Sequence, residues 1–181
     1  MKNKNIIKVC VAIAIGLMTS VGALAAPLNG DISFSGSGTL NNTGVADATS
    51  ITFVAATVAA GTGDYSGLSG EAATFNVLDF TTVGFTGNLA ISDLWTVVDG
   101  AVTYTFDLER ITSNGVLSNT LAIEGWGTAQ STKSGIDDHS AFFTLSSSGS
   151  GTNITFSSAT EVPDSGTTTA LLGLSMLGLA G

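Results

Sequence analysis

An alternation of apolar and polar residues with a period of two is the feature that most constrains the fold of this chain. It is clearest over residues 102–109, VTYTFDLE, where large apolar side chains take every second position. Successive side chains of a β-strand point to opposite faces, so this pattern indicates strands with one buried face and one solvent face. Shorter stretches of the same kind occur at residues 32–35, 51–53, 121–124, 143–145 and 154–157.

Short glycine-containing segments separate these stretches and predict turns. Asp99-Gly100 and Asn114-Gly115 are the strongest signals, because Asp-Gly and Asn-Gly pairs accept the positive φ of tight hairpin turns. We therefore expect residues 102–108 to pair with residues 95–98 on one side and with residues 117–123 on the other. Weaker turn signals lie at Asn29-Gly30, Thr62-Gly63-Asp64, Ser134-Gly135 and Ser148-Gly149.

These patterns predict a single all-β domain over residues 26–161, built as an antiparallel β-sandwich of the jelly-roll kind with roughly eight strands. A β-solenoid is the alternative, but the chain shows no repeat of fixed period, which stacked coils require. The glycines of Gly125-Trp126-Gly127 are typical of a bulge or a strand end. The large side chains expected in or near the core are Phe80, Phe85, Trp95 and Trp126.

The first 25 residues have the organisation of a secretory signal peptide, which we expect to be helical. Lysines precede an apolar run over residues 9–18, and small residues follow at Ala23, Ala25 and Ala26. This order of a basic, an apolar and a small-residue region predicts export through the Sec translocon, with cleavage after Ala25 or Ala26. The apolar run is shorter than the ~20 residues that span a bilayer.

Charge and cysteine content exclude several functional classes. The chain has 5 basic and 14 acidic residues, and its single cysteine, Cys10, lies in the leader. Without the leader's three lysines the net charge is 2 − 14 = −12, which argues against nucleic acid and anionic lipid as partners. The mature domain is expected to fold without a disulfide. No Asp-x-Asp-x-Asp-Gly motif is present, so we expect no metal or cofactor, although the carboxylates leave weak Ca²⁺ binding open.

No set of residues predicts catalysis. His139 is the only histidine and lies between Asp137-Asp138 and Ser140, but neighbours along a strand point to opposite faces and cannot form a convergent triad. Residues 135–138 are better explained as a solvated loop. Asp107 and Glu109 share one strand face, about 6.8 Å apart along the strand, and alternate with core residues. We therefore expect a protein that is not an enzyme.

The C-terminal residues carry the most specific motif. Val162-Pro163-Asp164-Ser165-Gly166 is followed by an apolar segment over residues 170–181, which we expect to be helical. Residues 162–181 resemble the PEP-CTERM sorting signals in their VPDSG variant. The resemblance implies a precursor held in the inner membrane and processed by the transpeptidase exosortase, with Pro163 and its neighbours as recognition residues. As a helix the apolar segment would cover about 18 Å of a ~30 Å hydrocarbon core, so we expect either a truncated or a defective signal.

Together, these features predict an exported cell-surface or extracellular-matrix protein with a structural or interaction role in a biofilm. Its partners would be exopolysaccharide or other matrix proteins. The alternative is a carbohydrate-binding module, since sandwich domains bind glycans on exposed aromatic platforms. The aromatic residues considered for such a platform are Tyr65, Trp95 and Trp126.

Overall fold

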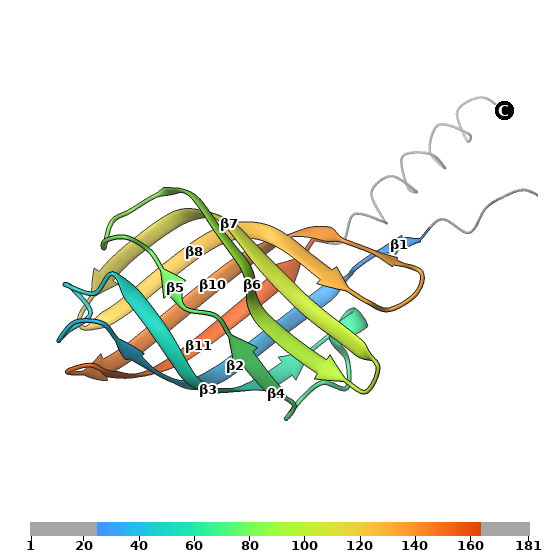
Figure 1. The fold of residues 1–181 in the computed structure, drawn as a ribbon, viewed down its shortest axis with the longest axis horizontal. Helices are drawn as coiled ribbons and strands as arrows, with labels where there is room; N and C mark the ends of the chain where they lie inside the picture. Colours follow the sequence, from blue (N-terminus) through green and yellow to red (C-terminus); the bar gives the residue numbers. More distant parts are fainter. Residues whose placement is uncertain (1–24, 164–181) are drawn as a thin grey trace, which may run out of the picture.

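Antiparallel strands close into a barrel in the computed structural model, which describes residues 25–163 (Figure 1). Most strands of the ring are long, up to 16 residues in β7. A single 3₁₀ turn, η1 (Gly63–Tyr65), interrupts the strands of the described residues. The strands are β1 (Ala26–Pro27), β2 (Gly30–Leu40), β3 (Ser50–Gly61), β4 (Ala72–Phe75), β5 (Leu78–Asp79), β6 (Gly87–Asp99), β7 (Val102–Leu117), β8 (Thr120–Ser131), β9 (Ile136–Asp137), β10 (His139–Ser150) and β11 (Asn153–Val162).

Strand β2 closes the ring because it pairs with both β11 and β3. The order around the barrel is β2-β11-β10-β8-β7-β6-β4-β3, and β5 adds to the edge of β3. The prediction of an all-β, antiparallel domain is confirmed. The predictions of a sandwich or jelly roll and of a solenoid are wrong, because a single sheet closes on itself. The predicted helices of the signal peptide and of the C-terminal apolar segment lie outside the described residues.

Bulges and glycines supply the curvature that closure requires. The β2–β3 register shifts between Ser33 and Phe34 and again between Ser37 and Gly38. Bulges bend a strand and increase its twist, which is how one sheet curls into a barrel. At Gly36 the neighbouring strand comes so close that a Cβ would overlap the carbonyl oxygen of Ala55. These features are local irregularities, and regular alternation does not reveal them.

The turns lie partly where the sequence predicts them. Asp99 pairs with Val102 across the β6–β7 hairpin, and Gly100 has a φ of +58°, so that prediction is confirmed. Asn114-Gly115 is not a turn: it lies inside β7, where Asn114 Nδ2 donates to the carbonyl oxygen of Thr82 at 2.9 Å. The β7–β8 turn is instead made by Ser118 and Asn119, whose φ values are +50° and +63°.

One more turn prediction needs the same correction, and one loop prediction needs a smaller one. Ser148-Gly149 continues β10, and the turn to β11 lies between the paired residues Ser150 and Asn153. Residues 135–138, predicted as a solvated loop, include β9, which pairs in parallel with β1. β10 extends past its turn-forming sequence because hydrogen bonds to a neighbouring strand outweigh the local preference. Residues 135–138 remain mostly exposed, as predicted, apart from the two-residue strand β9.

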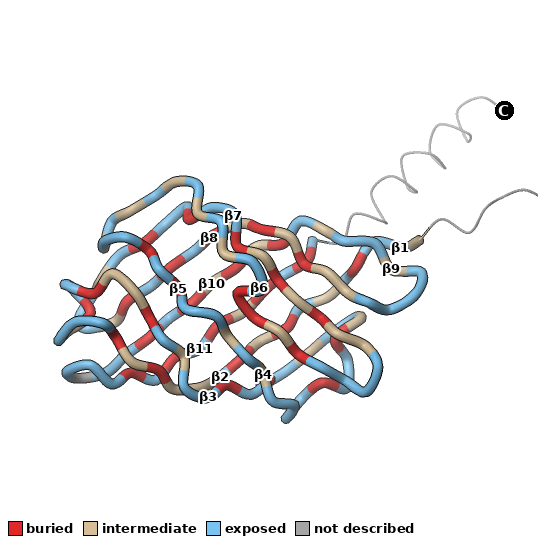
Figure 2. Tube along the Cα trace, viewed as in Figure 1, coloured by how far each residue is buried: buried red, intermediate tan, exposed pale blue. Residues whose placement is uncertain are grey.

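Aromatic side chains fill the interior of the barrel. Buried positions recur along the long strands of the ring (Figure 2). Trp95 is fully buried and packs against Phe34 at 5.1 Å and against Phe106 at 6.1 Å between ring centroids. Phe106 in turn stacks on Phe143. Trp95 Nε1 donates to Thr160 Oγ1 at 2.9 Å. The interior is therefore a packed core, and the indole N–H of Trp95 has a hydrogen-bond partner within it.

Two of the four predicted core anchors are fully buried. Phe80 and Trp95 have no exposed surface, whereas Phe85 and Trp126 are only half-buried. Trp126 alternates with the inward-facing residues Gly125 and Gly127, which places its ring on the outside of the barrel.

Within residues 25–163, no helix is long and apolar enough to cross a membrane.

Candidate functional site

A cross-strand row on the outside of the barrel gathers the aromatic and charged side chains of the candidate site. The register aligns Trp126 of β8 with Phe142 of β10, and Phe142 with Glu161 of β11. Glu161 pairs in turn with Asp31 of β2, while Arg110 of β7 pairs with Trp126 at the other end. Residues distant in sequence therefore form a continuous row with an aromatic pair in the middle.

The local sequence around Trp126 turns its ring outward. Gly125 and Gly127 occupy the inward positions on either side. A Cβ at Gly127 would overlap the carbonyl oxygen of Asp107 and come within 2.8 Å of the Phe106 ring. Opposite these glycines, the β7–β8 register shifts between Leu108 and Arg110. The predicted bulge at this segment is thus present, but it lies in the partner strand.

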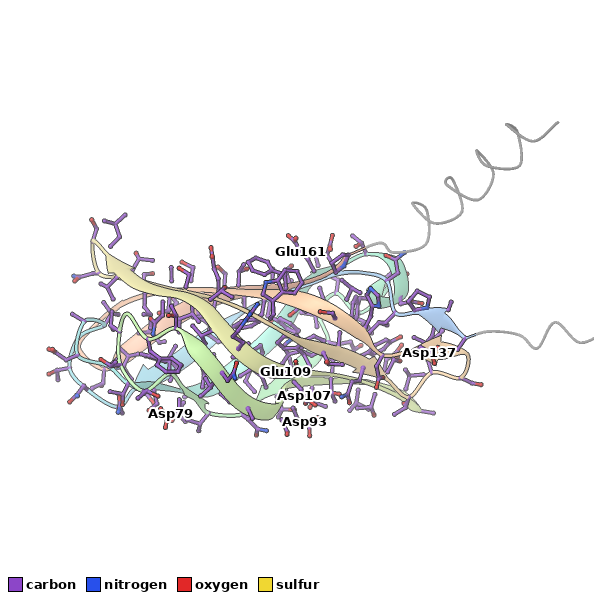
Figure 3. All side chains as sticks on the ribbon, turned by 90° about the horizontal axis from the view of Figure 1, so that it is seen from above. Asp79, Asp93, Asp107, Glu109, Asp137 and Glu161 are labelled. Carbon is purple, nitrogen blue, oxygen red and sulfur yellow. The ribbon has the colours of Figure 1, made fainter. Side chains whose placement is uncertain are left out.

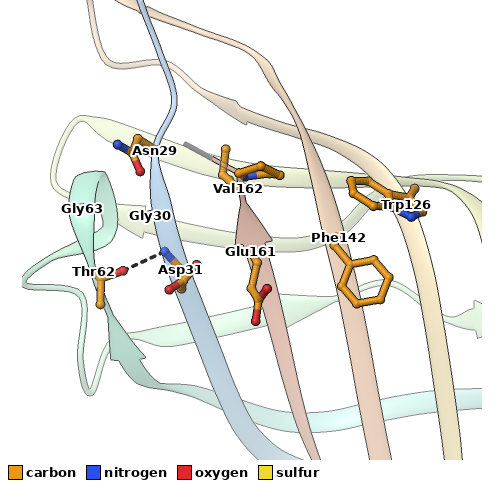
Figure 4. A pocket seen from close by; sticks show the side chains of 10 residues that line it. Asn29, Gly30, Asp31, Thr62, Gly63, Trp126, Phe142, Glu161 and Val162 are labelled. Carbon is orange, nitrogen blue, oxygen red and sulfur yellow. Dashed lines mark hydrogen bonds between the residues drawn. The ribbon is translucent and has the colours of Figure 1, made fainter. Parts of the chain in front are cut away.

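The aromatic pair borders a surface groove of about 610 Å³ (Figure 4). The rings of Trp126 and Phe142 are tilted by 55°, with centroids 5.2 Å apart. On the opposite side, the Asp31 backbone N–H donates to Thr62 Oγ1 at 2.8 Å, which ties the end of β3 to the start of β2. The residues lining the groove are Asn29, Gly30, Asp31, Thr62, Gly63, Trp126, Phe142, Glu161, Val162 and Pro163.

The groove carries two carboxylates that form no ion pair with any described residue. Glu161 and Asp31 are exposed and face each other directly across β11 and β2. Among the described residues, the one ion pair joins Lys133 to Asp64 at 3.2 Å. Like charges directly opposite in an antiparallel pair destabilise the sheet. The groove thus combines an aromatic surface with uncompensated negative charge.

The other two aromatic platform candidates lie inside the barrel. Tyr65 and Trp95 are fully buried, so neither ring is accessible to a ligand at the surface. Burial, reinforced by the charge of Asp64, raises the pKa of the Tyr65 phenol, which therefore stays neutral. Of the three residues considered from the sequence, only Trp126 reaches the outer face, because it alone alternates with glycines that face the core.

The sorting motif begins inside the last strand of the barrel. Val162 belongs to β11, pairs with Gly30 and is almost completely buried. Pro163 follows as an exposed residue beyond the strand. Asp164, Ser165 and Gly166 lie outside the described residues. The motif therefore starts where the barrel ends, and its first residue contributes to the barrel core.

The predicted signal-peptide cleavage positions lie before and at the start of β1. Ala25 precedes this strand, and Ala23 lies outside the described residues. The Ala26 N–H donates to the carbonyl oxygen of Gly135 at 2.9 Å. Cleavage after Ala25 would retain this hydrogen bond, whereas cleavage after Ala26 would remove the residue that makes it.

The acidic residues weighed as catalytic candidates make structural hydrogen bonds. Asp107 accepts from the backbone N–H of Asp93 at 2.7 Å and from Gln130 Nε2 at 3.1 Å. Glu109 accepts from Thr128 Oγ1 at 2.7 Å. Asp137 pairs within the small β1–β9 sheet, and His139 begins β10. Within residues 25–163, no group of three or more His, Cys, Asp or Glu side chains is placed to hold a metal ion.

Phe142, Glu161 and Asp31 were not anticipated as site residues. A signal for Phe142 is present in the sequence, because consecutive Phe142 and Phe143 in one strand must point to opposite faces. One of the two rings therefore has to lie outside the core. No sequence signal brings Glu161 and Asp31 beside it, because that placement depends on which strands are neighbours.

Comparison with known proteins identifies the C-terminal segment alone. Residues 161–181 match the model of the VPDSG-CTERM motif. No curated protein and no solved structure matches the chain. The motif indicates an exported protein that exosortase processes from a membrane-associated precursor, and the resemblance inferred for this segment is confirmed.

Proposed function

We propose that this chain is a cell-surface or extracellular-matrix protein, exported through the Sec translocon, whose barrel binds exopolysaccharide through the groove at Trp126. Exosortase processing follows from the C-terminal motif. The observation that carries the binding role is the half-buried Trp126–Phe142 pair on the outer face, since most other aromatic rings of the barrel pack inward. The role is one of binding, without catalysis and without a cofactor.

An aromatic pair next to polar side chains suits a sugar chemically. The apolar C–H faces of a pyranose stack on aromatic rings, while its hydroxyl groups hydrogen-bond to neighbouring polar groups, as in other small-molecule sites. Asn29, Asp31, Thr62 and Glu161 line the same groove as the two rings. The experiment below therefore measures binding to polysaccharide directly.

Trp126→Ala should abolish measurable binding to exopolysaccharide from the producing cells, because truncation of a central aromatic residue commonly costs 2 kcal/mol or more, about a 30-fold loss of affinity. Leu117→Ala is the matched control, since Leu117 is 81% exposed at the far end of β7. Pull-down and calorimetry with purified polysaccharide would measure both variants, and thermal unfolding would verify their folding. Unchanged binding by Trp126→Ala would contradict the glycan role.

Processing should fail in a precursor that carries Pro163→Ala together with Asp164→Ala, because both substitutions fall within the matched motif. The control variant is Asn153→Ala with Thr155→Ala, which alters exposed side chains of β11 outside the motif. Immunoblotting and intact-mass measurement in cells with the matching exosortase would distinguish precursor from product. Normal processing of the motif variant would refute exosortase recognition at these residues.

A further inference from the structure

We infer that the groove selects polysaccharides whose sugars carry free ammonium groups, such as polymers of glucosamine. The inference rests on the proposed glycan-binding function and specifies the ligand of the same groove. It comes from the arrangement of charge around the aromatic pair. Glu161 lies beside Phe142 in the cross-strand row, and Asp31 lies beside Glu161.

The two carboxylates form a local excess of negative charge. Neither Glu161 nor Asp31 has an ion-pair partner among the described residues. Arg110, at the opposite end of the row, is separated from Glu161 by three strand spacings, about 14 Å at the usual ~4.8 Å per strand. Lys133 is engaged by Asp64. Over such distances water and salt screen most of the attraction to exposed cations, so the repulsion between the paired carboxylates remains.

An ammonium group would relieve this repulsion and would contact the aromatic pair as well. A cation near the face of an aromatic ring is attracted by the ring's quadrupole, and tryptophan is the most favourable ring. An ammonium donates up to three hydrogen bonds, and those to carboxylates are stronger than those to neutral acceptors. A sugar stacked on Trp126 or Phe142 could therefore place its amine toward Glu161. A uronic acid in the same position would add a third negative charge.

The position of Glu161 allows a specific contact in the groove to be distinguished from the general attraction between an acidic protein and a polycation. Glu161 lies on the opposite side of the barrel from Asp93, which belongs to β6 (Figure 3). Asp93 is also exposed, and its positive φ of +50° is one that asparagine tolerates. Glu161→Gln and Asp93→Asn thus remove the same charge from opposite sides, each with little change in side-chain size.

The experiment measures calorimetric affinities of the mature protein for two tetrasaccharides with the same backbone. One is the β-1,4-linked tetramer of glucosamine and the other is its N-acetylated counterpart. Mildly acidic buffer keeps the amines of the glucosamine tetramer protonated. We expect the glucosamine tetramer to bind about tenfold more tightly. Glu161→Gln should weaken its binding about fivefold, the scale of one exposed ionic contact, and leave the N-acetylated tetramer unaffected.

The possible results separate this inference from the proposed function. Equal loss of glucosamine binding in Glu161→Gln and Asp93→Asn would overturn the inference, because net charge alone would then explain the affinity. Equal, Trp126-dependent affinities for the two tetramers would also overturn it, while the glycan-binding function would stand. If neither tetramer bound and polymers isolated from the producing cells did not bind either, both the inference and the proposed function would be refuted. Unchanged thermal unfolding would show that both charge variants are folded.

Discussion

Replacing Trp95 with alanine is expected to lower the free energy of unfolding by about 3–5 kcal/mol, the cost of removing a large aromatic side chain from a core. Trp95 has no exposed surface and contacts Phe34, Tyr65 and Phe106 within the barrel. The substitution also removes the hydrogen bond that the fully buried hydroxyl of Thr160 accepts from Trp95 Nε1. A typical domain has only about 5–15 kcal/mol of stability, so this single change should bring the barrel close to unfolding.

Urea denaturation of the mature protein would measure this loss, and the second tryptophan supplies the control. Trp126→Ala removes an equally large ring from the outside of the barrel and should cost well under half as much. Trp95→Phe should lie between the two, because it keeps most of the packing but removes the hydrogen bond to Thr160. Similar stability losses for Trp95→Ala and Trp126→Ala would contradict the assignment of one ring to the core and the other to the surface.

Gly127→Ala is expected to cost about 3 kcal/mol, at the upper end of overpacking effects. The added methyl group would overlap the backbone carbonyl of Asp107 and press on the Phe106 ring. Because the main obstacle is backbone, β7 and β8 would have to separate or shift register there. The substitution should therefore also disturb the orientation of Trp126, and we expect weaker glycan binding together with lower stability.

Gly115→Ala is the matched control for this prediction. Gly115 also lies in a barrel strand, β7, but a Cβ there would meet no atom within 4 Å. Its substitution should be neutral or slightly stabilising, since alanine restricts the unfolded chain more than glycine does. Thermal unfolding of both variants gives the comparison. If Gly127→Ala were as stable as Gly115→Ala, that result would contradict the close approach of β7 and β8 that the structure shows at Gly127.

The strands were predictable because alternation is a local property. Residues 102–108 point alternately inward and outward as expected, with Tyr104, Phe106 and Leu108 in the core. The predicted ends of strands were less accurate. Asn114-Gly115 has the composition of a turn, yet Asn114 is buried and hydrogen-bonded to Thr82. A contact with a residue 32 positions away overrides the local preference there.

The candidate site could be predicted only in part. Trp126 was considered as a platform residue, but Tyr65 and Trp95 were considered equally, and both are core residues. Residue type does not distinguish them, since all three are large aromatic residues. What separates Trp126 is the pair of flanking glycines, which can face a crowded interior where larger side chains cannot.

The sequence by itself determined that the chain forms strands, which side chains share a strand face, and that residues 161–181 carry a VPDSG-CTERM motif. These depend on neighbours one to a few positions apart. Only the tertiary structure decided that β2 pairs with both β3 and β11, closing a barrel rather than forming a sandwich. It also decided that Trp126, Phe142, Glu161 and Asp31 share one row. Strand order and register arise from long-range packing of the whole core, and local alternation is compatible with many such arrangements.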